Sequence, residues 1–226
     1  MNRGMFAAQI NNGWRLLHKL KLGEKRRETP LYSGIDDSGF RDKSYIEKWQ
    51  MLYTRHLFDF QLIDGALVQF RVLGDFRKFV LNYVYYDCPY DILTYKDYLK
   101  KVVGIDYAEA RDYFRQEYEE YIFASNLKKS VTPIRYDFDV DAYEEAVHPS
   151  SHVHIGDENK LRIGTEKVWK PISFLLFIVR HCYPEEWKNL VKIQEAEIWA
   201  KNVRDNLEEA PFVLESRIDK MEIVLA

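Results

Sequence analysis

Two alternating apolar segments joined by a two-residue turn constrain the fold of this chain more than any other feature. Residues 57–63 (LFDFQLI) and 66–73 (ALVQFRVL) each alternate apolar and polar side chains. Asp64 and Gly65 lie between them, and Asp-Gly at this position is a strong signal for a β-hairpin. Residues 78–87 (KFVLNYVYYD) are rich in Val, Phe and Tyr and read as a third strand. An antiparallel meander is therefore predicted in the first half of the chain.

Helical periodicity flanks these strands on both sides. The spacing of apolar residues predicts helices over residues 2–22, 44–55, 95–103, 106–126, 171–183 and 185–208. Further strands are predicted over residues 132–139, 151–156 and 161–163. We therefore expect an α+β fold with a mainly antiparallel sheet packed against several helices. Residues 1–226 are expected to form a single domain, with an N-terminal helix and linker (about 1–42) before the body.

The composition excludes several classes of protein. The chain has 33 Lys and Arg against 36 Asp and Glu, and 46% of its residues are hydrophobic, so intrinsic disorder is not expected. No apolar run reaches the roughly 18 to 20 residues that span a bilayer, and the two cysteines, Cys88 and Cys182, lie far apart. These features predict a cytoplasmic protein with no membrane partner. No phosphate-binding loop, GxSxG or HExxH motif is present in the sequence.

Three of the six histidines, His148, His152 and His154, lie within seven residues of the chain. In the preceding strand, IRYDFDVD, the side chains of Arg135 and Asp137 share the polar face, because successive side chains point to opposite faces. His152 and His154 share the polar face of HVHIG in the same way. If the two strands pair antiparallel, their polar faces coincide, because both apolar faces must meet the core. This predicts a cluster of Arg135, Asp137, His152 and His154, with His148 and Asp157 at its rim.

These residue types suit cleavage of a phosphodiester bond. His152 and His154 are the expected general acid and base, because imidazoles exchange protons near neutral pH. Asp137 is expected to orient one ring, and Arg135 to stabilise charge on the transition state. The groups expected to bind substrate are Lys128, Lys129 and His148.

Other interpretations of the same residues stay open. His-x-His with a carboxylate can hold Zn²⁺ or another divalent metal, and Asp137 or His148 could complete such a site. Without a second clear pair of ligands, no metal or cofactor is favoured. Histidine-triad chemistry fits less well, because Gly156 occupies the place of the third histidine. The groups can also be solvated and weakly paired, where ion pairs contribute only about 0 to 1 kcal/mol. The density of titratable groups on adjacent faces favours a functional site.

Two family resemblances extend this interpretation. Residues 59–70 (DFQLIDGALVQF), 135–156 (RYDFDVDAYEEAVHPSSHVHIG) and 171–187 (PISFLLFIVRHCYPEEW) resemble a bacterial family, domain of unknown function 2290. Over residues 135–177, the order RYD, HVHIGDE and an apolar helix is similar to TumE-like toxins, which are encoded beside helix-turn-helix antitoxins. The loop between the two motifs is longer here than in that family. The resemblance implies site positions at Arg135, Asp137, His152 and His154.

The leading hypothesis is a toxin-like or defence-associated nuclease that acts on RNA. The alternative is a non-catalytic subunit of a bacterial defence or toxin–antitoxin assembly, which binds a protein partner or antitoxin. Its aromatic residues and the acidic residues near its C-terminus would supply the binding surface. Those acidic residues are Glu195, Glu197, Asp205, Glu208 and Glu209. The distance between the histidine pair and Arg135 and Asp137 discriminates the two hypotheses.

Overall fold

The computed structural model describes residues 3–28, 40, 42–75, 78–157, 161–193, 196–211, 220 and 224–225. A seven-stranded sheet forms its centre, and each strand pairs antiparallel with its neighbours in sequence order. Its strands are β1 (Gly23–Arg26), β2 (Phe60–Leu62), β3 (Leu67–Asp75), β4 (Lys78–Tyr86), β5 (Ile134–Phe138), β6 (Ser151–Ile155) and β7 (Ile163–Gly164). A small second sheet pairs β8 (Lys167–Val168) with β9 (Glu208–Glu209). The predicted meander and the α+β class are confirmed.

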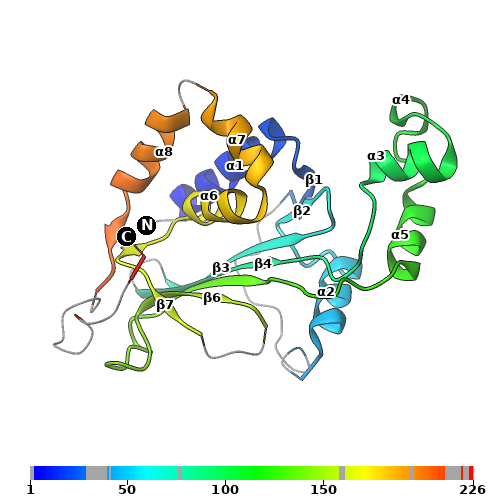
Figure 1. Ribbon diagram of the computed structural model, residues 1–226. Helices are drawn as coiled ribbons and strands as arrows, with labels where there is room; N and C mark the ends of the chain where they lie inside the picture. The colour runs from blue at the N-terminus through cyan, green and yellow to red at the C-terminus, as the bar shows by residue number, and fades with distance from the viewer. Residues whose placement is uncertain are drawn as a thin grey trace.

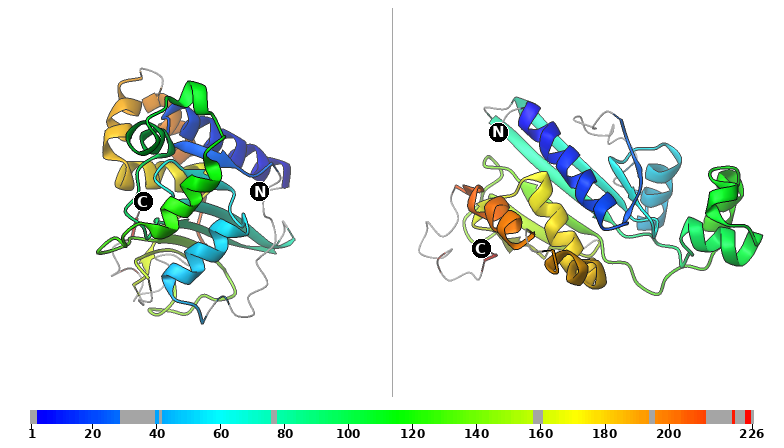
Figure 2. Two further views of the ribbon diagram at one scale, coloured as in Figure 1. Left: turned by 90° about the vertical axis from the view of Figure 1, so that its right-hand side faces the viewer. Right: turned by 90° about the horizontal axis from the view of Figure 1, so that it is seen from above.

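The helices are distributed unevenly around the sheet (Figure 1). Above it in Figure 1 lie α1 (Arg3–Lys19), α6 (Pro171–Cys182), α7 (Pro184–Val191) and α8 (Ala196–Asp205). Below it lies α2 (Tyr45–Thr54). An arm that projects beyond the end of the sheet contains α3 (Tyr95–Tyr98), the π-helical turn η1 (Leu99–Val103), α4 (Tyr107–Ala110) and α5 (Arg115–Ala124), as Figure 2 also shows. None of the described helices is long and apolar enough to cross a membrane.

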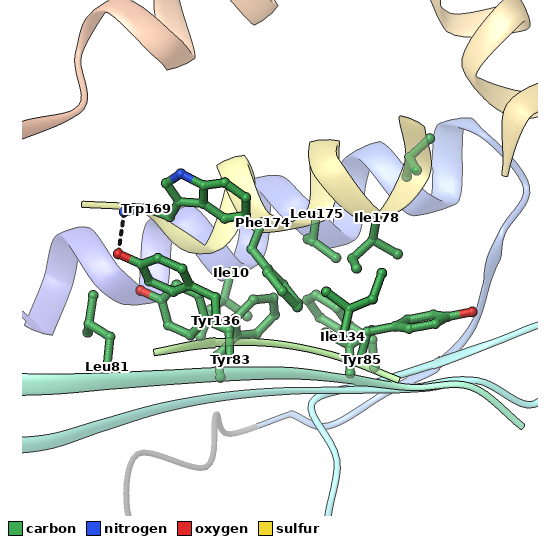
Figure 3. Packing of buried hydrophobic residues seen from close by; sticks show 14 of the residues in the cluster. Ile10, Leu81, Tyr83, Tyr85, Ile134, Tyr136, Trp169, Phe174, Leu175 and Ile178 are labelled. Carbon is green, nitrogen blue, oxygen red and sulfur yellow. Dashed lines mark hydrogen bonds between the residues drawn. The ribbon is translucent and has the colours of Figure 1, made fainter. Parts of the chain in front are cut away.

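The main core lies between the sheet and the helices α1 and α6. Alternate residues of β4 and β5, including Tyr83 and Tyr136, point to this side because side chains alternate along a strand. Phe174 of α6 is fully buried among aromatic rings, with its ring centroid 5.8 Å from that of Tyr83. Figure 3 shows these side chains meeting between the sheet and α6. Gly13 of α1 allows a close approach where the two helices meet, because a Cβ atom there would force the Leu175 side chain to shift.

A second core covers only one end of the opposite face of the sheet. The N-terminus of α2 is fixed by a capping box, in which Ser44 and Glu47 exchange side-chain and backbone hydrogen bonds. The helix buries Trp49 and Leu52 in a cluster with strand residues that include Val84. The apolar side chains of this face are thus gathered at one end. Farther along the same face, β4, β5 and β6 present polar side chains.

The N-terminal region differs from the prediction. The predicted first helix is present as α1, but Phe6, Ile10 and Leu17 place it inside the main core rather than ahead of it. Gly23–Arg26, predicted as the start of a linker, pairs with β2 as the edge strand β1. Most of the remaining predicted linker, residues 29–39 and 41, lies outside the described residues.

Two predicted helices are interrupted. The helix predicted over residues 106–126 is divided into α4 and α5, because the chain turns at Arg111, where φ is 42°. The hydroxyl of Tyr95 donates a hydrogen bond to the Arg111 carbonyl (2.7 Å), and the Arg115 guanidinium lies 3.7 Å from the centroid of the Tyr95 ring. These contacts offset the helical hydrogen bonds lost at the turn. Likewise, the predicted helix over residues 185–208 is present as α7 and α8.

Replacing Tyr136 with phenylalanine should destabilise the fold. The Tyr136 hydroxyl accepts a hydrogen bond from the Trp169 amide (2.9 Å) and lies 2.9 Å from the Ser151 hydroxyl, all in buried surroundings. Its removal leaves the Trp169 N–H unpaired, which costs about 1 to 3 kcal/mol. Urea unfolding measures the loss. The control, Tyr113→Phe at a side chain that is 80% exposed, should unfold like the wild type, and equal stability of both variants would contradict the prediction.

Candidate functional site

Strands β5 and β6 bring the predicted site residues together. In their antiparallel register Arg135 lies opposite His154, and Asp137 lies opposite His152. The predicted pairing and the coincidence of the two polar faces are therefore confirmed. All four side chains lie on the face of the sheet that is opposite α1 and α6, because the alternate residues Ile134, Tyr136, Phe138 and Val153 fill the main core.

Three of these side chains converge on one point. The Nε2 atoms of His152 and His154 lie 3.0 Å apart. The Oδ2 atom of Asp137 lies 3.3 Å from the His154 Nε2 and 3.8 Å from the His152 Nε2. We call Asp137, His152 and His154 the His/Asp cluster. Their potential ligand atoms all lie within 4.8 Å of one another, so this is the group of described residues that could hold a metal ion.

Neighbouring groups hold Asp137 and His152 in place. Asn82 of β4 donates a hydrogen bond to Oδ1 of Asp137 (2.6 Å), and the Nε of Arg135 donates to its Oδ2 (2.7 Å). The Nδ1 of His152 lies 2.8 Å from the Pro149 carbonyl oxygen. A carbonyl can only accept, so Nδ1 carries the proton, and in the neutral ring Nε2 presents its lone pair to the cluster.

Burial and charge set the protonation states. Burial lowers the pKa of His152 to about 4, although the charge of Asp137 opposes the shift. Burial alone would raise the pKa of Asp137, but the hydrogen bond from His154, the charge of Arg135 and the hydrogen bond from Asn82 outweigh it and lower that pKa to about 2. At neutral pH Asp137 is therefore a carboxylate and His152 a neutral imidazole.

The cluster forms part of the wall of a cleft of about 670 Å³ on the open face of the sheet. His154 and Asp137 line the cleft, whereas His152 lies behind them with only 1% of its side chain exposed. The α2 helix contributes Lys48 to the lining. The basic, acidic and histidine side chains that line the cleft are Lys48, Arg71, Arg135, Asp137, Asp139, His148, His154 and Asp157.

The structure separates the three groups predicted to bind substrate. His148 lines the cleft, and its ring meets that of His152 edge-on with centroids 4.7 Å apart. Lys128 and Lys129 are not among the residues that line the cleft. Lys128 pairs with Asp87 at 2.9 Å, and Lys129 is exposed beside it. The structure does not bring these two lysines to the cluster.

Sequence reasoning missed Asn82, Lys48 and Arg71. Alternation along the third predicted strand places Asn82 on the polar face, since Leu81 and Tyr83 are apolar. The sequence carried that signal, but it did not predict that β4 pairs with β5 across the arm. Arg71 carried the same alternation signal, because Phe70 and Val72 on either side of it are apolar. Lys48 had no local signal, because its position at the cleft depends on how α2 packs.

The fold and the site together define an α+β protein with a His/Asp/Arg site on the open face of an antiparallel sheet. The model of a family of uncharacterized conserved proteins, DUF2290, matches residues 25–222, and the chain belongs to this family. No curated protein and no solved structure matched the chain. The predicted resemblance to this family is confirmed, while the similarity to TumE-like toxins stays a prediction.

Proposed function

We propose that this protein is a cytoplasmic, toxin-like or defence-associated nuclease that cleaves RNA in the cleft. One observation carries the proposal: the His/Asp cluster and the Arg135 guanidinium lie together at the wall of a cleft large enough for a nucleotide. Titratable groups held by several partners in a cleft are typical of catalytic sites. Arg135 supplies a phosphate-binding cation beside them.

Arg135 is suited to bind the scissile phosphate. Its Nε is held by Asp137, while 46% of its side chain is exposed. A guanidinium anchored at Nε can present its two terminal nitrogens, whose paired N–H groups match the oxygens of a phosphate. Lys48 and Arg71 line the same cleft, and cations spaced along a cleft can contact neighbouring phosphates of a nucleic-acid strand.

The contact between the two histidines constrains the chemistry. A separate general acid and general base would act on opposite sides of the phosphorus, but nitrogens 3.0 Å apart reach the same atom. The geometry therefore favours joint activation of one attacking water by the cluster, rather than the separate roles expected from the sequence. The water oxygen bonds to phosphorus and gives a proton to the cluster. The bond from phosphorus to the leaving ribose oxygen breaks, and that oxygen takes up one proton from a solvent water molecule.

Arg135→Gln should weaken RNA binding, which is measured as a higher KM for RNA cleavage. A hydrogen bond to a charged group contributes about 1.5 to 3 kcal/mol, so the KM for a short fluorogenic RNA should rise roughly 10- to 100-fold. DNA of the same base order serves as the comparison substrate. The control, Arg204→Gln at an exposed arginine of α8, should keep the wild-type KM. The proposal fails if the wild-type protein cleaves no RNA, and the role of Arg135 fails if both variants behave alike.

Exposed apolar side chains on the arm favour the second candidate, a non-catalytic subunit that binds a protein partner. Val102, Tyr107 and Tyr113 are 57%, 44% and 80% exposed. Such side chains on a projecting element suit a protein contact. If expression of the Asp137→Asn variant affects growth as strongly as expression of the wild type, the effect does not need the cluster, and this candidate replaces cleavage.

A further inference from the structure

We propose that Asp137, His152 and His154 form a binding site for one divalent transition-metal ion, with Zn²⁺ as the expected occupant. The inference deepens the proposed function. A catalytic use of the ion rests on that function, whereas binding of the ion does not. It assigns the His/Asp cluster the role of metal ligands, which the sequence by itself did not favour.

The separations of the three atoms suit coordination of a single ion. Zn²⁺ binds imidazole nitrogen and carboxylate oxygen at about 2.0 to 2.2 Å, so two such ligands on one ion lie roughly 3.0 to 3.5 Å apart. The observed separations are 3.0, 3.3 and 3.8 Å between the two Nε2 atoms and Oδ2 of Asp137. Only a small approach of His152 and Asp137 is needed to place all three at bonding distance.

The hydrogen bonds of the cluster point to a cation at its centre. The Nε2 of His152 offers a lone pair, because its Nδ1–H is donated to the Pro149 carbonyl. The Oδ2 of Asp137 is also an acceptor, which takes one hydrogen bond from the Arg135 Nε and keeps a lone pair for a second partner. The single proton on the His154 Nε2 can be donated only partly to each of these two acceptors. They are the Nε2 of His152 at 3.0 Å and the Oδ2 of Asp137 at 3.3 Å. A metal ion that replaces this proton would satisfy all three atoms at once.

Outer contacts have the form that metal sites use to orient their ligands. Ligating histidines commonly donate their second N–H to a carbonyl, as His152 does to Pro149, and ligating carboxylates accept further hydrogen bonds, as Asp137 does from Asn82. Arg135 also contacts Asp137, and its positive charge opposes a nearby cation. Because 46% of the Arg135 side chain is exposed, the side chain can turn away from Asp137 toward a phosphate.

The ligand types select the class of metal. Two imidazole nitrogens and one carboxylate oxygen suit Zn²⁺ and its transition-metal neighbours, whereas Mg²⁺ and Ca²⁺ prefer all-oxygen sites. Three protein ligands leave a coordination position for water, which is typical of a catalytic site. That position would face the cleft, since His154 and Asp137 line it. Such an ion lowers the pKa of its bound water to about 7, which would supply the attacking oxygen of the proposed cleavage.

Metal binding by the full-length protein tests the inference without reference to activity. After chelator treatment and dialysis, Zn²⁺ is titrated by calorimetry, and Co²⁺ is titrated by visible absorption, whose d–d bands report coordination. We expect one ion per chain. His152→Ala and His154→Ala should weaken binding by more than the roughly 10- to 100-fold that is typical of losing an outer-shell partner, and Asn82→Ala should fall within that range.

Two controls separate the site from adventitious binding and from misfolding. His18→Ala removes an exposed histidine of α1 and should leave binding unchanged. His154→Gln keeps much of the side-chain volume, so a folded variant that no longer binds metal would support the assignment. Wild-type protein that takes up no stoichiometric Zn²⁺ or Co²⁺, or cluster variants that bind like the wild type, would overturn it.

The outcomes also separate this inference from the proposed function. Stoichiometric, cluster-dependent metal binding without RNA cleavage in any metal would keep the metal site and reject the nuclease. Undiminished RNA cleavage by metal-free protein in chelator, together with absent metal binding, would keep the nuclease and reject the metal site.

Discussion

His154→Ala is expected to lower the rate of RNA cleavage by roughly 100- to 10,000-fold, the range typical when acid–base catalysis at a site is disabled. His154 should be the more sensitive histidine because it both lines the cleft and contacts the other two members of the His/Asp cluster. Its loss also removes a hydrogen-bond partner of Asp137 and a proposed metal ligand. The measurement is kcat/KM with a short fluorogenic RNA.

Three comparisons make this experiment decisive. His181→Ala removes an exposed histidine from α6, on the other side of the sheet, and should retain wild-type kcat/KM. His154→Gln should lose activity without a matching loss in urea unfolding, which separates chemistry from stability. A folded His154→Ala protein with more than a tenth of the wild-type rate would remove the basis for catalysis by the cluster.

Phe174→Ala is expected to lower the free energy of unfolding by about 3 to 5 kcal/mol, the usual cost of deleting a buried aromatic ring. Phe174 is fully buried where α6 meets the sheet, with its ring centroid 5.8 Å from that of Tyr83 and 6.2 Å from that of Phe70. The rings of Phe70 and Tyr83 belong to β3 and β4, whose other faces contribute side chains to the cleft. Urea unfolding followed by tryptophan fluorescence measures the loss.

The matched control for this variant is Tyr113→Ala. Tyr113 is also aromatic, but 80% of it is exposed, so its replacement should change the free energy of unfolding by less than about 0.5 kcal/mol. Phe174→Leu should fall between the two, because it leaves a smaller cavity. A loss below about 1 kcal/mol in Phe174→Ala would mean that the core can close around the deletion.

The strands of the meander, the pairing of β5 with β6 and the composition of the cluster could be predicted because they follow from local alternation. Arg135 and Asp137 are two residues apart, as are His152 and His154, and a strand places such pairs on one face whatever surrounds it. A slip of one residue would have moved Tyr136 and Val153 out of the core, so burial fixes the register in which the polar pairs meet.

The turn at Arg111 could not be predicted in this way. The helical periodicity of the segment continues through it, and the contacts of Tyr95 with Arg111 and Arg115 that accompany the turn come from another helix. The interior geometry of the cluster is similarly nonlocal. The Pro149 carbonyl fixes the ring of His152, and Asn82 reaches Asp137 only because β4 and β5 are neighbours across the inserted arm.

Alternation along each strand, a property of the extended backbone, already specified in the amino-acid order which side chains share a face. It could not specify which of those faces stays open. The α2 helix covers only one end of the polar face, and this packing leaves the cleft that His154 lines and to which Lys48 and Arg71 contribute. The contact of the two Nε2 atoms likewise depends on side-chain rotamers held by Asn82, Arg135 and Pro149. Packing between distant segments therefore turned a polar strand face into a candidate site.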